Sequence, residues 1–247
     1  MSREGFTGTG AGAFTPDGCA VEVWRRLPVG TEPQVIAASV PPGASILELG
    51  CGAGRVTHPL VDLGYAVTAV DESAQMLAQI RGARTVQASI EGLDLEQTFD
   101  AVLLGSFLVH NPDGATARRL LATCVRHVAP GGVVLLQREG VGWHEDLPRV
   151  RDLPDAGTVR VLSSDEVRPG VRSVLVEYEF PDARWTHTFQ SRPLDDAAFD
   201  ALLAAEGLVA DAYLTDDRTW VRCVPIHHTP PSSAVHPLGG TASPLGR

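Results

Sequence analysis

The chain has 247 residues, a formal net charge of −10 and 20 basic residues, every one of which is arginine. This length suffices for one domain with a full hydrophobic core, and no apolar run reaches the length of a membrane span, so no membrane partner is expected. An acidic chain without a basic stretch is poorly suited to nucleic acid, and the absence of lysine excludes Schiff-base and Walker-type lysine chemistry.

The N-terminal segment predicts a mobile arm followed by short helices. Residues 1–13 are rich in glycine and threonine and are expected to be mobile. Val21, Trp24 and Leu27 recur at helical spacing, and a second short helix is predicted at residues 34–40. Trp24 has two interpretations, as a packing residue or as part of the wall of an acceptor pocket.

The stretch at residues 45–73 predicts a strand, a glycine-rich turn, a helix and a second strand. The short apolar run at 45–49 precedes alternating glycines, and Gly64 ends the following helix. The second strand, 66–70, ends at Asp71 and Glu72. This order is the first half of a doubly wound, nucleotide-binding α/β fold.

The residue types in this turn suit a nucleoside ligand with an anionic group. Glycines allow a close approach of the backbone, and a helix N-terminus attracts a carboxylate or phosphate. An acidic residue at the end of the next strand accepts hydrogen bonds from ribose hydroxyls. Both a dinucleotide and S-adenosylmethionine meet these requirements. The dinucleotide fingerprint, however, needs a glycine where Arg55 stands.

The pattern E-x-G-x-G-x-G, from Glu48 to Gly54, resembles motif I of the class I S-adenosylmethionine-dependent methyltransferases. The resemblance extends over roughly residues 40–225. It implies a Rossmann-like sheet of seven strands, with an N-terminal helix that covers the cofactor as a lid. It also implies S-adenosylmethionine as the cofactor and a set of cofactor-binding residues, namely Glu48, Gly50, Gly52, Gly54, Arg55, Asp71, Glu72, Ser89, Ile90 and Ser106.

Several of these assignments follow from position in the motif. Glu48 is expected near the amino end of the cofactor, and Asp71 at the ribose. Ser89 stands where the family commonly has an aspartate that binds the adenine amino group, so the expected hydrogen bond lacks charge assistance. Ile90 offers an apolar face to the adenine. For Arg55, a role on the helix surface and a contact to the cofactor carboxylate both remain open.

The third and fourth strands are predicted at residues 85–88 and 101–105, and Ser106 follows the fourth, where the resemblance implies the transferable methyl group. A helix is expected at 116–128. The sequence Pro130–Gly131–Gly132 then leads into a fifth strand at 133–137.

Residues 138–192 interrupt the expected alternation of strand and helix. Two stretches, Val171–Phe180 and Arg184–Gln190, alternate in polarity and are joined by a turn, which predicts a hairpin with aromatic residues on its faces. Aromatic side chains on the faces of a hairpin need another part of the protein to pack against. We therefore expect a small antiparallel β cap, inserted after strand five, over the carboxyl ends of the parallel strands.

The C-terminal part predicts a helix at residues 195–206 and an antiparallel pair of strands at 208–214 and 219–224. These elements complete a methyltransferase domain over residues 41–226, preceded by an arm and lid helix at 1–40. Residues 227–247 lack an apolar period and are expected to form a disordered tail.

Candidate catalytic residues are the histidines near the expected acceptor side, His144, His110 and His187. Each also has a structural interpretation, in which it orders a loop or packs in the cap. Glu139 is a candidate for binding an acceptor amine or for simple solvation. Methyl transfer needs alignment of the acceptor more than a fixed catalytic motif, since positioning contributes roughly 7–11 kcal/mol.

The four cysteines are scattered without a C-x-x-C pair, which predicts reduced thiols, a cytoplasmic protein and no metal site. The N-terminus also lacks the layout of a signal peptide. The expected function is O- or N-methylation of a small-molecule acceptor, plausibly in secondary metabolism, by a monomer or homodimer. Two alternatives remain: a non-catalytic module that binds S-adenosylmethionine, and an NAD-dependent oxidoreductase.

Overall fold

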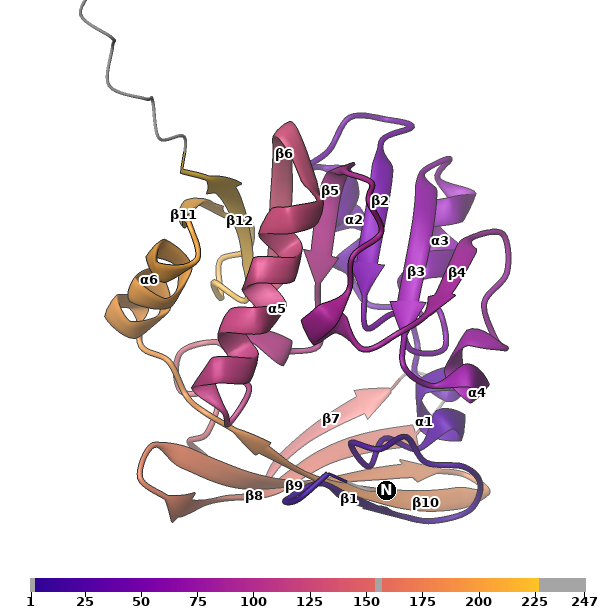
Figure 1. Ribbon diagram of the computed structural model, residues 1–247. Helices are drawn as coiled ribbons and strands as arrows, with labels where there is room; N and C mark the ends of the chain where they lie inside the picture. The colour runs from indigo at the N-terminus through magenta and orange to yellow at the C-terminus, as the bar shows by residue number, and fades with distance from the viewer. Residues whose placement is uncertain (1–2, 154–156, 227–247) are drawn as a thin grey trace, which may run out of the picture.

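The computed structural model describes residues 3–153 and 157–226, which form two β-sheets and their covering helices (Figure 1). The larger sheet has seven strands in the order β11-β12-β6-β5-β2-β3-β4. Its strands are β2 (Ser45–Leu49), β3 (Ala66–Asp71), β4 (Arg84–Gln87), β5 (Phe99–Leu104), β6 (Val128–Gln137), β11 (Leu208–Tyr213) and β12 (Trp220–Pro225). The predicted doubly wound α/β sheet is confirmed.

The directions of the strands determine the edge of the sheet at which a ligand can bind. β4, β3, β2, β5 and β6 are parallel to one another, and β12 and β11 run antiparallel at the far edge. The carboxyl ends of β2, β3 and β5 therefore meet at one edge of the sheet, which points toward the second sheet (Figure 1). Ligands of open α/β sheets bind at this edge.

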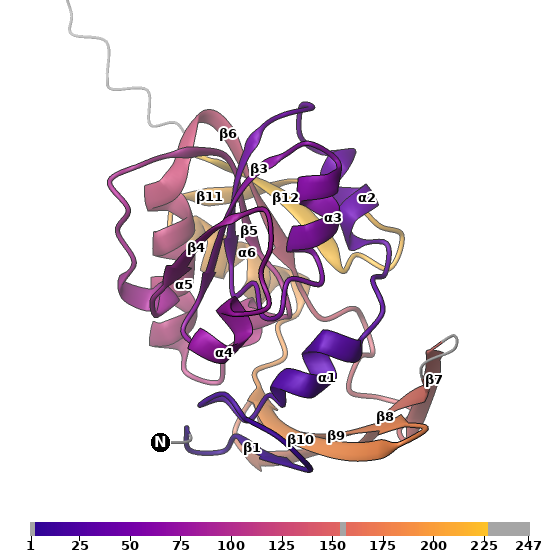
Figure 2. The same ribbon diagram turned by 90° about the vertical axis from the view of Figure 1, so that its right-hand side faces the viewer.

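The helices are α1 (Val21–Arg26), α2 (Glu32–Ala37), α3 (Thr57–Asp62), α4 (Ala74–Leu77), α5 (Gly114–His127) and α6 (Asp196–Ala205), with 3-10 turns η1 (Ile90–Gly92) and η2 (Leu108–His110). The larger sheet has helices on both of its faces. α5 and α6 lie on one face and α2 and α3 on the other (Figures 1 and 2). The side chains of Asp113 and Asp195 cap the N-termini of α5 and α6.

The core follows from the alternation of side chains along the strands. Leu47 and Leu49 of β2 point to the face covered by α5 and α6, whereas Ile46 packs with Leu60 on the other face. Both faces of the central strands are therefore apolar, as expected of parallel strands buried between helices.

The second sheet is the predicted cap. It is antiparallel, in the order β1-β10-β9-β8-β7, and consists of β1 (Thr7–Thr9), β7 (Arg149–Leu153), β8 (Gly157–Arg168), β9 (Val171–Phe180) and β10 (Ala183–Ser191). The predicted hairpin is the β9–β10 pair, with Phe180 opposite Ala183. The sequence also predicted a mobile arm at residues 1–13, whereas Thr7–Thr9 pair with Thr186–Thr188 as an edge strand of the cap.

The cap packs on α1, which lies between the two sheets (Figure 2). Ala20 and Val23 form a buried cluster with Leu153, Phe180 and Trp185 of the cap strands. The indole Nε1–H of Trp185 donates to the carbonyl of Ala11 (2.7 Å), so the N-terminal arm is bonded to the cap as well. The predicted tail at 227–247 lies outside the described residues. Among the helices of the described ranges, none is long and apolar enough to cross a membrane.

Candidate active site

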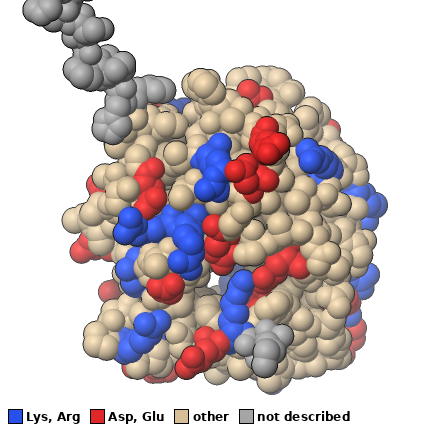
Figure 3. Space-filling model, in the orientation of Figure 1, with Lys and Arg blue, Asp and Glu red and all other residues tan. Residues whose placement is uncertain are grey.

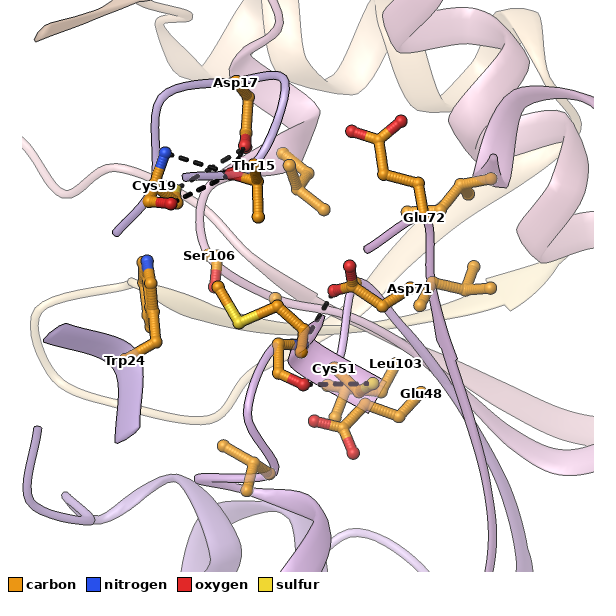
Figure 4. A pocket seen from close by; sticks show the side chains of 18 of the residues that line it. Thr15, Asp17, Cys19, Trp24, Glu48, Cys51, Asp71, Glu72, Leu103 and Ser106 are labelled. Atoms are coloured by element: carbon orange, nitrogen blue, oxygen red, sulfur yellow. Dashed lines mark hydrogen bonds between the residues drawn. The ribbon is translucent and has the colours of Figure 1, made fainter. Parts of the chain in front are cut away.

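A cavity with about 1160 Å³ of space, part of it open to solvent, lies at the carboxyl edge of β2, β3 and β5 (Figure 4). All predicted cofactor residues line it except Gly54; they are Glu48, Gly50, Gly52, Arg55, Asp71, Glu72, Ser89, Ile90 and Ser106. These residues lie at or after the carboxyl ends of separate strands, and the parallel order of the strands brings them to one edge of the sheet.

The glycine turn adopts a backbone that requires glycine. The N–H groups of Gly50 and Cys51 both donate to the carbonyl of Val70 (2.9 Å each), which folds the turn back onto β3. Gly50 and Gly52 have φ angles of +75° and +55°. A Cβ on Gly50 would lie 3.0 Å from Leu108 Cδ1, and a Cβ on Gly52 would point into open space. The backbone at Gly52 is therefore accessible to a ligand from the cavity.

Gly54 serves the packing of the turn instead. A Cβ at this position would lie 2.6 Å from the His58 ring and 2.8 Å from Ile80 Cδ1, and its φ is +88°. The absence of a side chain allows the turn to lie directly against α3.

Asp71 connects the end of β3 to the glycine turn. Its Oδ2 accepts from the Gly52 N–H (2.9 Å) and its Oδ1 from the Ser73 N–H (2.8 Å). Burial raises the pKa of Asp71, and these backbone hydrogen bonds oppose the rise. Each carboxylate oxygen keeps acceptor capacity on the cavity side. The neighbouring Glu72 is paired with Arg3 of the N-terminal arm (2.9 Å).

Glu48 is a buried carboxyl group at the base of the cavity. Its side chain accepts a hydrogen bond from Thr57 Oγ1 (2.6 Å), and the residue is 5% exposed. Burial raises the pKa of Glu48 to about 7, while Thr57 and Arg55 act in the opposite direction. A cationic group placed beside Glu48 would compensate its charge.

We expect Glu48→Gln to stabilise the ligand-free protein at alkaline pH. Because the folded pKa of about 7 lies above the ordinary value of 4.5, the wild-type free energy of unfolding falls as the pH rises between these values, by about 3 kcal/mol. The amide removes this penalty. Urea unfolding of both proteins at pH 5 and pH 8 measures it: the variant should gain at pH 8 relative to pH 5, and a constant difference would contradict the buried-carboxyl assignment.

Arg55 lies at the same end of the cavity. Its Nη1 is 2.6 Å from Glu32 Oε1 in a largely buried ion pair, so the residue is not simply part of an exposed helix surface. Glu32, just after the N-cap of α2, was not predicted as a site residue. The remaining donors of the guanidinium are available to a carboxylate in the cavity.

Ser89 and Ile90 lie at the opposite end, where η1 begins. Ser89 Oγ is hydrogen-bonded to the carboxylate of Glu91, which also lines the cavity. Because this bond uses the hydroxyl proton, the lone pairs of Ser89 Oγ remain free to accept from a ligand amine.

Ser106 follows β5 in a strained turn. Ser106 and Phe107 have φ angles of +53° and +59°, in the left-handed region that non-glycine residues rarely occupy. The Ser106 N–H donates to Gln137 Oε1 (2.8 Å), which ties the turn to the end of β6. Backbone strain of this kind is often found at functional sites.

None of the candidate catalytic histidines lines this cavity. His110 accepts from the Glu139 N–H at Nε2 (2.9 Å) and lies 3.1 Å from the Arg192 carbonyl at Nδ1. His144 is bonded to Glu139 Oε2 at Nε2 (2.9 Å) and to Ser164 Oγ at Nδ1 (2.7 Å). Both ring nitrogens of each histidine are therefore engaged by the protein.

His187 differs from these two residues. Its Nε2 donates to the Asp17 carbonyl (2.9 Å), which leaves Nδ1 as an unprotonated acceptor, and burial lowers its pKa. It lines a small neighbouring cavity that shares Cys19 and Trp24 with the large one. Among the described residues, no hydrogen bond engages its Nδ1.

The N-terminal arm supplies cavity residues that sequence reasoning missed. Thr15, Asp17 and Cys19 form a hydrogen-bonded loop that faces Asp71 and Glu72 across the cavity, and Trp24 of α1 lies beside it (Figure 4). The turn at Pro16–Gly18 was visible in the sequence, but nothing local indicated that it would reach the cofactor edge. Because Trp24 lines the cavity, its interpretation as part of the wall of an acceptor pocket stays a prediction.

Charges on the surface shown in Figure 3 are interspersed rather than gathered into a patch of one sign. Within residues 3–153 and 157–226, no cluster of histidine, cysteine, aspartate and glutamate side chains is arranged to hold a metal ion.

Comparison with known proteins shows which proteins this chain is similar to. Residues 46–132 match the family model described as "Methyltransferase domain". The ubiquinone biosynthesis O-methyltransferase of Xanthomonas oryzae pv. oryzae is 36% identical over 104 residues, which are 38% of this chain and 42% of that protein. The match thus spans about two fifths of the length of the curated relative.

Solved structures extend the likeness over the whole fold. The sugar N-methyltransferase KedS8 from Streptoalloteichus sp. superposes with a TM-score of 0.64 at 22% identity, over 89% of this chain and 98% of that one. The glycopeptide N-methyltransferase MtfA, solved with S-adenosylmethionine, gives a TM-score of 0.57 at 26% identity, over 79% and 93% of the two chains. Residues 46–132 thus match a methyltransferase domain, and the seven-stranded sheet with its glycine turn and acidic strand end has the fold of the class I S-adenosylmethionine-dependent methyltransferases.

Proposed function

We propose that this protein transfers the methyl group of S-adenosylmethionine to an oxygen or nitrogen atom of a small-molecule acceptor. The observation that carries the proposal is the cavity at the carboxyl edge of the sheet, into which the predicted cofactor residues converge. The residues fit the cofactor: the open space at Gly52 admits the nucleoside, and the buried Glu48 forms no ion pair with the described residues, so the amino group could pair with it.

The chain's own residues would hold the cofactor along the sheet edge. Asp71 and Glu72 bind the ribose, Ser89 and Ile90 the adenine, and Glu48 and Arg55 the amino-acid end. The bound cofactor supplies an already activated methyl group, so the protein must align the acceptor and exclude water. Ser106 faces the acceptor side, and the Thr15–Cys19 loop with Trp24 covers the cavity.

An acceptor that loses a proton needs a base, and a general base increases the rate of the reaction by roughly 10²–10⁴-fold. Of the candidate histidines, His187 has a ring nitrogen that no described residue engages, and its small cavity shares Cys19 and Trp24 with the large one, so we propose it as the base for such acceptors. His110 and His144 are proposed as residues that position the site, because the protein already engages their ring nitrogens.

The acceptor is proposed to be a small metabolite. The curated relative named above is an O-methyltransferase and the structural neighbours act on a sugar and a glycopeptide, so the test panel should contain phenols, amino sugars and peptide amines. We further propose a cytoplasmic protein of secondary metabolism, monomeric or homodimeric, with an arm and lid at 1–40 and a methyltransferase domain at 41–226 that carries the cap at about 138–192.

The proposal predicts micromolar binding of S-adenosylhomocysteine and no binding of NAD by isothermal titration calorimetry. A nicotinamide-dependent enzyme would show the reverse. Incubation of the panel with methyl-labelled cofactor then separates an enzyme from a non-catalytic binding module: label should pass to at least one acceptor class. Absence of S-adenosylhomocysteine binding would overturn the proposal.

A further inference from the structure

An ion pair at the Glu48 end of the cavity joins α2 to the end of the glycine turn. Arg55 Nη1 donates to Glu32 Oε1 (2.6 Å), and both residues line the cavity. Only 18% of the Arg55 side chain and 14% of the Glu32 side chain are exposed, so solvent screens this pair weakly. Glu32 Oε2 is buried and has no hydrogen-bond partner among the described residues, which leaves Arg55 as the one described partner of this carboxylate.

We infer that Glu32 is a positioning residue, which holds the guanidinium of Arg55 in the orientation that binds the carboxylate of the cofactor's amino-acid end. The inference rests on the proposed function, because it gives Glu32 a part in holding S-adenosylmethionine. Arg55 touches the ligand in this assignment, and Glu32 acts through Arg55.

The pair leaves the other donors of the guanidinium free. Glu32 takes an N–H of Arg55 Nη1, whereas Nε and Nη2 donate to no described residue. Neither of these two nitrogens is a buried atom without a partner, so both keep accessible surface on a residue that lines the cavity. A guanidinium presents its donors as a planar fork that matches a carboxylate. Because Glu32 fixes the arginine in advance, the side chain loses less conformational freedom when it binds the ligand.

The charges at this end of the cavity suit a zwitterion. Burial raises the pKa of Glu48, and Thr57 and Arg55 act in the opposite direction, so the charge of Arg55 is felt at Glu48. Arg55 nevertheless pairs with Glu32, and Glu48 forms no ion pair with the described residues. The anion of Glu48 and the cation of Arg55 thus both remain available. An α-amino acid carries an ammonium and a carboxylate on one carbon, which would pair with Glu48 and Arg55 respectively.

The residue at position 30 makes room for the Glu32 carboxylate. A Cβ on Gly30 would clash with Glu32 Oε2, the tip of a flexible side chain. The φ of Gly30 lies outside the left-handed region, so the backbone itself does not require a glycine there. A side chain at this position would therefore displace the carboxylate from its place beside Arg55 and leave its charge unchanged.

Isothermal titration calorimetry with two ligands tests the role of Glu32. S-adenosylhomocysteine has the amino-acid end, whereas 5′-methylthioadenosine has the same adenosine and sulfur without it. Glu32→Gln should bind S-adenosylhomocysteine about tenfold more weakly than wild type, and Arg55→Gln about 30-fold, because charge-assisted hydrogen bonds are misaligned or lost. Both variants should bind 5′-methylthioadenosine within about twofold of wild type, which also shows that they are folded.

The double variant separates positioning from an independent contact. Because Glu32 acts through Arg55, the protein that carries both Glu32→Gln and Arg55→Gln should bind S-adenosylhomocysteine as weakly as Arg55→Gln alone and no more weakly. Gly30→Ala displaces the Glu32 carboxylate and should weaken S-adenosylhomocysteine without affecting 5′-methylthioadenosine. This variant keeps the test valid if Glu32→Gln fails to fold.

Glu206→Gln is the matched control. Glu206 pairs with Arg118 (2.7 Å) and 15% of its side chain is exposed, close to the value for Glu32, but neither residue of this pair lines the cavity. The control should bind both ligands like wild type.

Three results would overturn the inference and leave the proposed function in place. They are an affinity of Glu32→Gln for S-adenosylhomocysteine that is unchanged or higher, an equal loss of both ligands in that variant, and additive losses in the double variant. A higher affinity would mean that Glu32 competes with the ligand for Arg55. A wild-type protein that does not bind S-adenosylhomocysteine would overturn both the inference and the proposed function.

Discussion

Replacing Gly52 by leucine should abolish binding of S-adenosylhomocysteine, with a loss of at least about 100-fold in affinity. The backbone at Gly52 has a φ of +55°, and a Cβ there would meet no protein atom within 4 Å. The new side chain would thus project into the space that the cofactor needs. Isothermal titration calorimetry of the purified variant measures the loss.

Gly64→Leu provides the matched control. Gly64 also has a positive φ, of +90°, with open space around its Cβ, but it lies at the exposed end of α3. Both substitutions should destabilise the protein by about 1–2 kcal/mol, since both force a side chain into the left-handed region. Only Gly52→Leu should lose the ligand. Equal affinities in the two variants would place the cofactor elsewhere.

Asp71→Ala should weaken cofactor binding by two to three orders of magnitude. The carboxylate holds the Gly52 N–H (2.9 Å) and the Ser73 N–H (2.8 Å), and we assign it the ribose hydroxyls as well. Hydrogen bonds to a charged group contribute roughly 1.5–3 kcal/mol each, and the substitution removes several at once. Asp71→Asn, which retains one acceptor oxygen, should lie between wild type and alanine in the same titration.

Asp100→Ala separates this effect from a general loss of a carboxylate. Asp100 accepts from the N–H (2.8 Å) and hydroxyl (2.7 Å) of Ser45, at the start of β5 and away from the cavity. Its removal should lower the free energy of unfolding and leave the affinity unchanged. An Asp71→Ala variant that binds as tightly as Asp100→Ala would refute the ribose assignment.

Local chemistry was sufficient to predict the glycine turn and the acidic end of the second strand. Gly50, Gly52 and Asp71 act through backbone conformation and a strand end, and both features follow from residue type and spacing within a short segment. The parallel sheet and the β9–β10 hairpin follow from apolar periodicity in the same way.

Pairing between segments far apart in the chain could not be predicted from local sequence patterns. The arm at Thr7–Thr9 was expected to be mobile because glycine and threonine carry no apolar period, yet β10 supplies the hydrogen bonds that hold it. The histidines were candidates for catalysis because the sequence indicates which side of the sheet they approach. It does not indicate that Glu139, Ser164 and the Arg192 carbonyl engage the rings of His110 and His144, which lie outside the cavity.

The amino-acid sequence by itself determined the α/β sheet, the glycine turn and the acidic strand end, because these depend on contacts between residues close in the chain. Only the tertiary structure showed which residues of the N-terminal arm line the cavity, and which histidine rings the protein's own groups engage. Some of those contacts join groups far apart in the chain, such as His187 and the Asp17 carbonyl. The packing of the cap on α1 and on the N-terminal arm brings such groups together.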